Sequence, residues 1–238
     1  MTILEKLVKL GYEKEKAKRI IMSGQVKINE NIIFIPSEKI LEEDQVSIKE
    51  SKQWVSRGAY KLLAAIDEFN INFKDLIVLD IGSSTGGFSH VALAYGAKHV
   101  YALDVGTNQL SYKIRSDKRV TTIEKTNLKT ITKDMFQDKI DFVVTDVSFI
   151  SLKYMFQVAK DIGDESLQIM ALIKPQFEAN SNQVEPGGFV PEEIHSNIID
   201  KVKKYAVDNN FKMSAMSKSP IKGKKIKNIE YITLFERN

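Results

Sequence analysis

The chain has 238 residues, 43% of them hydrophobic, and a formal net charge of +4, which suits one α/β domain with a small additional module. It contains no cysteine, which excludes disulfides, thiolate zinc sites, iron–sulfur clusters and pyrimidine carbon-5 methyltransfer through a cysteine adduct. No leader-like start and no apolar run near the roughly 20 residues of a membrane helix are present. We therefore expect a soluble cytoplasmic protein, a monomer or weak dimer, that uses neither a membrane nor a metal.

Residues 1–50 predict a compact α+β module. Apolar residues at helical spacing favour one helix around Ile3–Val8 and another around Ala17–Ile21, separated by a break at Gly11. Between Val26 and Ile35, apolar and polar residues alternate on both sides of an Asn-Glu-Asn turn, which is typical of a small β unit.

The run from Glu15 to Asn29, EKAKRIIMSGQVKIN, resembles the alpha-L RNA-binding domain named for small-subunit ribosomal protein S-four. The resemblance implies contacts with RNA phosphates, made without reading sequence, by the basic side chains Lys16, Lys18, Arg19 and Lys27. Neighbouring acids nearly balance these bases, so a solvated helix face is the alternative.

Residues 51–58 are polar, lack an apolar period and carry the only tryptophan, Trp54. We interpret them as an ordered linker between residues 1–50 and a second domain, residues 59–238. Trp54 is more typical of an interdomain packing anchor than of a ring that stacks on a base or on a cofactor adenine. Arg57, in the same stretch, is a candidate RNA contact.

From residue 59 the pattern is a helix followed by strands alternating with helices, which indicates a doubly wound α/β sheet of seven strands. The expected helices include residues 86–95, 151–160 and 191–209. The expected strands are residues 76–81, 99–104, 119–124, 140–145, 168–173, 212–216 and 230–235.

A glycine-rich turn, DIGSSTGGF from Asp80 to Phe88, directly follows the first of these strands. Its spacing fits neither a phosphate-binding loop nor a dinucleotide fingerprint. Asp104, at the end of the next strand, can accept the hydroxyls of a ribose. A residue that can bind a ribose, together with a loop that lacks a phosphate-binding motif, favours S-adenosylmethionine as the cofactor. The alternative is a packing turn in which Asp80 and Asp104 cap helices.

Four charged residues are expected at the same edge of the sheet. Asp146 and Lys174 each end a strand, and Pro175 marks the exit of the second one. Glu230 would join them if the last strand is antiparallel, and Lys61 could reach over from the preceding helix. The sequence therefore predicts a cluster of two lysines and two carboxylates beside the cofactor loop.

Long motifs resemble the TlyA/hemolysin A family over nearly the whole chain: WVSRGAYKLL at 54–63, DIGSSTGGF at 80–88, TDVSFISL at 145–152 and LIKPQFE at 172–178. The family joins the RNA-binding domain to an FtsJ-like, Rossmann-like class I methyltransferase domain. Its activity is 2′-O-methylation of ribosomal RNA, typically at cytidine, with S-adenosylmethionine.

The resemblance also implies roles for residues. Lys61, Asp146, Lys174 and Glu230 match its catalytic tetrad, with Lys174 as the candidate base. Asp104 would take the ribose, Val105 and Asn127 the adenine, and the methionine side would face Gly82, Ser84, Thr85 and Gly86. The rest of the expected cofactor site is Asp80, Gly87 and Phe88.

A basic stretch, 212–227, precedes Glu230 and would attract RNA through Lys222, Lys224 and Lys225. Phe149 could stack on a splayed base or pack in the core. Ribosomal RNA or ribosomal subunits are the expected partners. An amino-group methyltransferase is disfavoured because Asp146-Val-Ser-Phe replaces Asp/Asn-Pro-Pro-Tyr. A non-catalytic RNA-binding or ribosome-assembly protein is the alternative function, and any hemolytic effect would be indirect.

Overall fold

A computed structural model describes the chain except residues 23, 42, 49–53 and 222–227. The chain divides into two compact units, Met1–Gln53 and Trp54–Asn238. Residues 54–58, which we expected in the linker, have their contacts within the second unit. Trp54 is buried there and packs edge-on against His90 at 4.8 Å between ring centroids.

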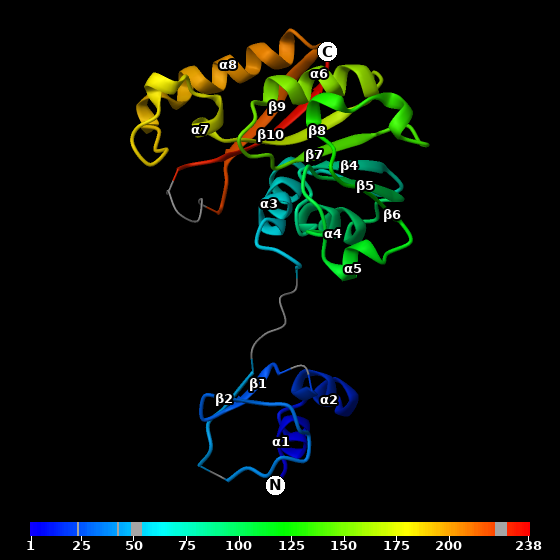
Figure 1. Cartoon of the computed structure of the whole chain (residues 1–238), viewed down its shortest axis with the longest axis vertical. Helices are drawn as coiled ribbons and strands as arrows, with labels where there is room; N and C mark the ends of the chain where they lie inside the picture. The colour runs from blue at the N-terminus through cyan, green and yellow to red at the C-terminus, as the bar shows by residue number, and fades with distance from the viewer. Residues whose placement is uncertain (23, 42, 49–53, 222–227) are drawn as a thin grey trace. The chain divides into compact units, whose positions relative to one another are not determined.

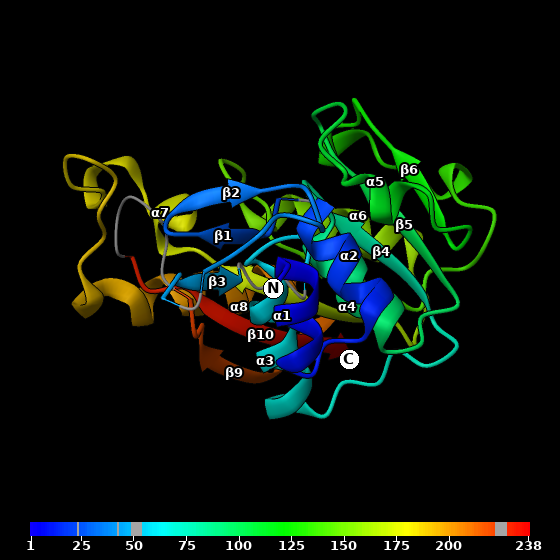
Figure 2. The same ribbon diagram turned by 90° about the horizontal axis from the view of Figure 1, so that it is seen from below.

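The first unit contains two helices and a small antiparallel sheet with strand order β2-β1-β3 (Figure 2). The elements are α1 (Ile3–Lys9), α2 (Lys14–Met22), β1 (Val26–Ile28), β2 (Asn31–Ile33) and β3 (Val46–Ile48). Thr2 and Glu5 form a capping box at the start of α1. The sequence prediction omitted β3, because three half-exposed residues give too short an alternation to detect.

The second unit is a seven-stranded sheet with strand order β6-β5-β4-β7-β8-β10-β9 (Figure 1). The strands are β4 (Ile77–Ile81), β5 (His99–Leu103), β6 (Val120–Ile123), β7 (Phe142–Thr145), β8 (Gln168–Ile173), β9 (Phe211–Lys218) and β10 (Tyr231–Arg237). The first five are parallel, and β10 runs antiparallel to both β8 and β9. This confirms the predicted doubly wound sheet.

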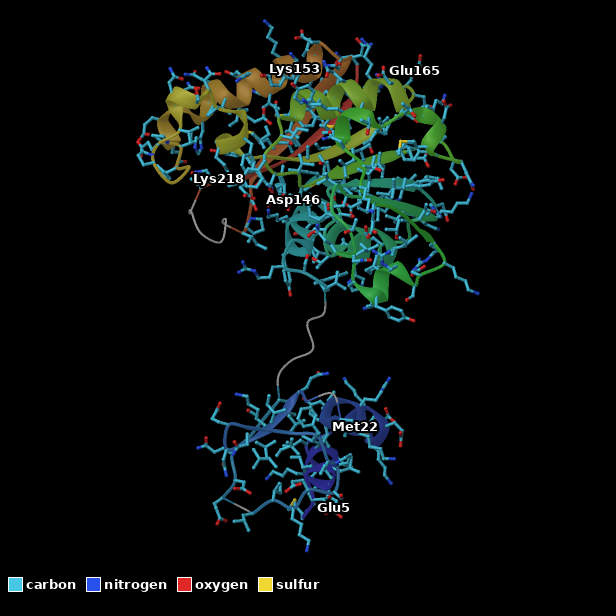
Figure 3. The ribbon with its side chains drawn as sticks, in the orientation of Figure 1. Glu5, Met22, Asp146, Lys153, Glu165 and Lys218 are labelled. Atoms are coloured by element: carbon cyan, nitrogen blue, oxygen red, sulfur yellow. The ribbon has the colours of Figure 1, made fainter. Side chains whose placement is uncertain are left out.

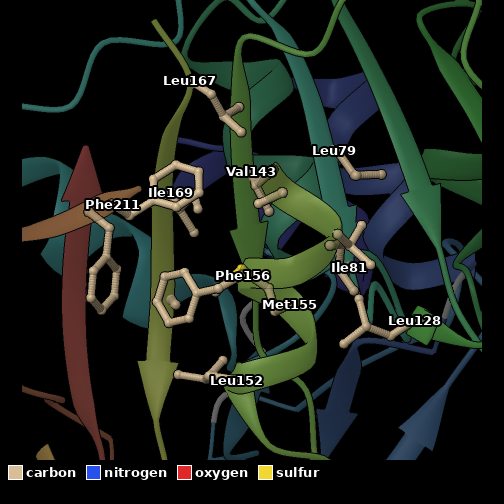
Figure 4. Packing of buried hydrophobic residues seen from close by; sticks show 14 of the residues in the cluster. Leu79, Ile81, Leu128, Val143, Leu152, Met155, Phe156, Leu167, Ile169 and Phe211 are labelled. Atoms are coloured by element: carbon tan, nitrogen blue, oxygen red, sulfur yellow. The ribbon is translucent and has the colours of Figure 1, made fainter. Parts of the chain in front are cut away.

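Helices cover both faces of this sheet (Figure 1). They are α3 (Ala59–Phe69), α4 (Gly87–Ala94), α5 (Tyr112–Arg115), α6 (Leu152–Ile162), α7 (Pro175–Glu178) and α8 (His195–Val207). One core lies between the sheet and α3, α4 and α5, and the other between the sheet and α6 and α8. Figure 4 shows the second core, where the fully buried Phe156 of α6 lies against the sheet.

Burial on both faces explains why the central parallel strands β4 and β7 are nearly continuous apolar runs, since neither face meets water there. β4 and β7 are buried along their entire length. No helix among the described residues is long and apolar enough to cross a lipid bilayer.

Candidate active site

The topology brings the four predicted charged residues to one edge of the sheet. Asp146 directly follows β7 and Lys174 directly follows β8, and parallel strands end at a common edge. Because β10 is antiparallel, its start lies at that edge too: Tyr231 pairs with Ile173, the last residue of β8, and Glu230 precedes it. Asp146 lies at the end of β7, next to α3 (Figure 3).

These side chains form a continuous row of ion pairs. Lys61 Nζ donates to Glu230 Oε2 at 2.7 Å and to Asp146 Oδ2 at 3.1 Å. The other oxygen of Asp146, Oδ1, lies 2.6 Å from Lys174 Nζ. Asp146 therefore bridges the two lysines, and the four charges sum to zero when both lysines are protonated.

Burial makes this row different from surface ion pairs. The side chains of Lys61, Lys174 and Glu230 are buried, and that of Asp146 is 23% exposed. Charges removed from water are stable only when they are paired and hydrogen-bonded. The one partly open member is the carboxylate shared by both lysines, so the row opens to a ligand at Asp146.

The pKa of Lys61 is raised above its usual value. Burial disfavours the ammonium, but the negative charges of Asp146 and Glu230 and the hydrogen bonds to them outweigh that penalty. Lys61 is therefore a fixed positive charge at neutral pH and has no lone pair with which to accept a proton.

Lys174 sits in a cradle made by the loop that follows β7. Its Nζ donates to the carbonyl of Val147 at 2.9 Å and lies 3.0 Å from Ser148 Oγ, in addition to its contact with Asp146. A carbonyl and a carboxylate only accept hydrogen bonds, whereas a hydroxyl also donates. Ser148 is thus the one described neighbour of Nζ that can face a lysine lone pair.

A cavity of about 510 Å³ opens beside Asp146, a volume typical of small-molecule sites. Five of the predicted cofactor residues line it: Gly82, Ser84, Asp104, Val105 and Asn127. Asp146, Ser148 and Phe149 form part of the same wall. The structure therefore places the expected cofactor loop and one member of the charged row around a single cavity.

Asp104 keeps capacity for a ligand although both of its oxygens are already bonded. Ser84 N donates to Oδ2 and Gly106 N donates to Oδ1, each at 2.8 Å. An ionised carboxylate offers about four lone-pair positions, so two remain for ribose hydroxyls. The backbone bonds fix the carboxylate toward the cavity, which suits the nucleoside part of S-adenosylmethionine.

Two glycines of the loop are required by backbone geometry. Gly82 and Gly86 have φ values of 81° and 88°, a region that favours glycine. A Cβ on Gly82 would lie 3.2 Å from Val147 Cγ1, and one on Gly86 would lie 2.8 Å from Leu110 Cδ1. Side chains here would push the loop away from the cavity wall.

The remaining expected cofactor residues do not line the cavity. Asp80 is buried, and its Oδ2 accepts hydrogen bonds from Ser89 N at 2.9 Å and from Ser89 Oγ at 2.6 Å. It thereby caps the first turn of α4 from the neighbouring strand. Thr85 is exposed outside the cavity, and Gly86, Gly87 and Phe88 are buried in the packing of α4.

Burial raises the pKa of Asp80 to about 7; the hydrogen bonds from Ser89 lower it, while the nearby Asp146 and Asp104 add to the increase. Asp80 is thus a carboxyl group that the fold prefers to keep neutral.

Some cavity residues were not predicted as site residues. Gln109 lines the cavity and its amide oxygen accepts from Ser84 Oγ at 3.3 Å. Thr126, Leu128 and Ile150 also line it. Gln109 and Thr126 lie in loops after strands, where only their position next to Asp104 and Asn127 could have indicated them.

The predicted RNA contacts fall into three groups. In the first unit, Lys18 pairs with Glu15 and Lys27 with Glu30, while Lys16 and Arg19 are exposed. In the second unit, Arg57 is exposed, and Phe149 is 91% exposed at the cavity with φ 63°. The third group, Lys222, Lys224 and Lys225, lies outside the described residues.

Phe149 is therefore not a core residue. Its ring lies 4.9 Å from that of Phe177, between centroids, and a left-handed backbone at a phenylalanine is uncommon and strained. Such strain is typical of residues held in place for a function. Among the described residues, no cluster of His, Asp and Glu side chains suits a metal ion.

The sheet order, the cavity at the strand ends and the loop after β4 define a methyltransferase of the doubly wound class. A solved methyltransferase from Listeria monocytogenes shares this fold, with a TM-score of 0.57 at 13% identity over 76% of this chain and 99% of that one. The model of the FtsJ-like methyltransferase family matches residues 54–237. The chain belongs to this family.

Whole-chain relatives confirm the resemblance to the TlyA/hemolysin A family. Hemolysin A of Brachyspira hyodysenteriae is 42% identical over 230 residues, which cover 94% of this chain and 95% of that protein. The 16S/23S rRNA (cytidine-2′-O)-methyltransferase TlyA of Mycobacterium tuberculosis is 34% identical over 225 residues, 93% and 84% of the two chains. A solved hemolysin structure from Lactococcus lactis has a TM-score of 0.76 at 43% identity, covering 79% of this chain and 90% of that one.

Proposed function

We propose that this protein transfers the methyl group of S-adenosylmethionine to the 2′-hydroxyl of a nucleotide, most naturally a cytidine, in ribosomal RNA. The proposal rests mainly on the row of ion pairs Lys174–Asp146–Lys61–Glu230, which lies beside the cavity that Asp104 lines. The substrate class rests on relatives named as ribosomal RNA methyltransferases. From such a substrate we infer that the protein acts in the cytoplasm, on ribosomal RNA or on ribosomal subunits.

The cavity suits S-adenosylmethionine by its chemistry. Asp104 offers lone pairs to a ribose, Val105 and Leu128 offer apolar surface to a base, and Gly82 lets the backbone approach a ligand closely. When bound, the cofactor supplies a methyl group on a sulfonium whose leaving group is a neutral thioether.

A ribose hydroxyl is a weak acid, so the protein must remove its proton as the new bond to carbon forms. The raised pKa of Lys61 keeps that residue charged, so of the two lysines in the row we assign the base to Lys174. A neutral Lys174 would keep its bond to the Val147 carbonyl and direct its lone pair to the side of Ser148, which lines the cavity. A hydroxyl placed there can deliver its proton to Nζ.

Lys61 and Asp146 do not accept the proton; they stabilise the charges that change during the transfer. Asp146 orients Lys174 through Oδ1 and faces Lys61 through Oδ2. When Lys174 takes up a proton, Asp146 stabilises the new ammonium, while Lys61 and Glu230 keep the rest of the row neutral. No further charged group has to move during the transfer.

The test is methyl transfer from labelled S-adenosylmethionine to unmodified ribosomes, to isolated subunits and to naked RNA. We expect incorporation at a ribose that resists alkaline hydrolysis at the adjacent bond, and its loss in Lys174→Ala. A base-linked methyl group, or undiminished transfer by Lys174→Ala, would overturn the proposal.

A further inference from the structure

Three buried polar side chains link the chain on either side of Glu230 to the segment before α8, without taking part in the chemistry above. Asn228, His195 and Tyr231 have exposed fractions of 2%, 3% and 6%. Two of them flank Glu230 in sequence, and the third begins α8. Buried polar groups are costly unless they are hydrogen-bonded, so their partners indicate what they stabilise.

Asn228 clamps the backbone of the segment that precedes α8. Its Oδ1 accepts from Val190 N at 3.1 Å, and its Nδ2 donates to Gly188 O at 2.8 Å. The amide of one side chain thus satisfies a donor and an acceptor on the two sides of Phe189.

His195 ties the same segment to the other side of Glu230. Its Nε2 lies 3.1 Å from Val190 O and its Nδ1 lies 2.9 Å from Tyr231 Oη. A carbonyl oxygen can only accept, so Nε2 carries the hydrogen; in the neutral ring, Nδ1 then accepts from the Tyr231 hydroxyl.

Hydrogen bonds therefore connect Asn228 to Val190, Val190 to His195 and His195 to Tyr231, and the backbone from 228 to 231 completes the ring. We call this set of residues the brace. It meets the main chain at Asn228 and Tyr231, one on each side of Glu230. Strand pairing of β10 begins only at Tyr231, and the Glu230 carbonyl accepts from Ser219 N at 2.8 Å. Together with the bond from Ser219, the brace anchors the chain where it enters β10.

We propose that the brace is a positioning device for Glu230, which sets the place of Lys61 in the charged row; the inference rests on the proposed function. The Glu230 carboxylate lies 2.7 Å from Lys61 Nζ, and the cost of displacing such a pair grows steeply in a buried site. Loosening the brace moves Glu230 and Lys61 relative to Asp146, while the cofactor cavity, lined by other residues, stays intact.

The test is Tyr231→Phe, which removes one hydroxyl and keeps the ring. We expect kcat to fall about 10-fold, as a small displacement of a catalytic group can cause, with the cofactor Kd and the RNA KM within about twofold of wild type. A purely structural role would reduce the amount of folded enzyme and leave kcat per folded molecule unchanged. His195→Gln breaks the same link from the other side and should give the same loss.

The matched control is Tyr101→Phe. Tyr101 is buried to a similar degree; its hydroxyl donates to Asp138 Oδ2 at 3.0 Å and accepts from the backbone N–H groups of Gln137 and Asp138, away from the charged row. We expect a similar loss of stability and a normal kcat. A normal kcat in both Tyr231→Phe and His195→Gln would overturn the positioning role that we assign to the brace.

A double-mutant cycle with Glu230→Gln separates the two proposals. If the brace acts through Glu230, Tyr231→Phe adds little to the loss that Glu230→Gln already causes. Full additivity would overturn the positioning role. If Glu230→Gln and Lys174→Ala both retain wild-type turnover, the proposed function fails instead.

Discussion

The ion pair Lys18–Glu15 of the first unit and the pair Lys61–Glu230 of the charged row join the same kinds of side chain in opposite surroundings. Lys18 and Glu15 lie 3.0 Å apart with exposed fractions of 40% and 66%. Lys61 and Glu230 lie 2.7 Å apart with 11% and 6%. The distances are similar, so the difference in burial decides what each pair can do.

An exposed pair contributes little to stability and exchanges readily with other ions, so Lys18 can leave Glu15 for a phosphate. A buried pair has no competing solvent and cannot be left half-complete. The first unit can therefore offer its bases to RNA, whereas the row in the second unit holds a fixed geometry. The following predictions test this contrast, from the largest expected effect to the smallest.

Lys174→Ala should give the largest effect. It removes the proposed base and leaves the cofactor cavity, which Lys174 does not line, unchanged. We expect kcat to fall about 1,000-fold, within the range for loss of a general base, with little change in cofactor affinity measured by calorimetry. Lys203→Ala, which breaks an exposed pair with Asp200 on α8, is the control and should keep full activity.

Asp80→Asn tests a buried carboxyl that Ser89, rather than a cation, stabilises. Asp80 has a pKa of about 7 in the fold, above its ordinary value of 3.8. The folded state therefore binds this proton more tightly than the unfolded state, and the free energy of unfolding falls as pH rises from about 4 to about 7.

The asparagine carries no charge and can still accept both hydrogen bonds from Ser89. At pH 8 we expect Asp80→Asn to be more stable by as much as about 4 kcal/mol, because each pKa unit corresponds to about 1.4 kcal/mol. Urea unfolding at pH 5 and pH 8 measures this. An equal gain in the free energy of unfolding at pH 5 and at pH 8 would show that ionisation of Asp80 does not cause the loss of stability at higher pH.

These two residues also show what the sequence could and could not predict. Lys174 was predictable because an apolar run that ends at Lys-Pro places the lysine at the carboxyl edge of the sheet. The environment of Asp80 was not. Its place in the glycine-rich turn fits a cofactor ligand, but the direction of its side chain depends on the packing of α4 against β4, which brings Ser89 within hydrogen-bond distance.

The brace shows the same limit. The strand pattern indicated β10 and the place of Glu230, since a short, mostly apolar run is a local property of the sequence. The bonds of Asn228 to Gly188 and Val190 join positions about 40 residues apart. Nothing in the local pattern around either partner encodes such a pairing, so it had to come from the structure.

Lys61→Met compares a buried pair with an exposed one directly. It leaves Glu230 buried without its cation, and breaking a buried pair in this way costs about 3 kcal/mol or more. Lys18→Met breaks an exposed pair and should change stability little. Urea unfolding of both variants measures the contrast, and similar losses in the two would refute the role that we assign to burial.

The smallest expected effect concerns RNA affinity. Replacing Lys16, Lys18 and Arg19 of α2 by glutamine removes two exposed positive charges and a half-exposed one. Their loss should reduce the salt dependence of RNA binding by about 0.7 per phosphate contact. Glu15→Gln is the matched control with the opposite sign: it frees Lys18 from its partner and should strengthen binding slightly at low salt. Filter binding across a salt series measures both slopes. If the triple variant keeps the wild-type slope, these bases only face solvent, and the first unit binds RNA through other residues. A lower slope with an unchanged kcat on saturating RNA would assign RNA binding to the exposed charges and the chemistry to the buried ones.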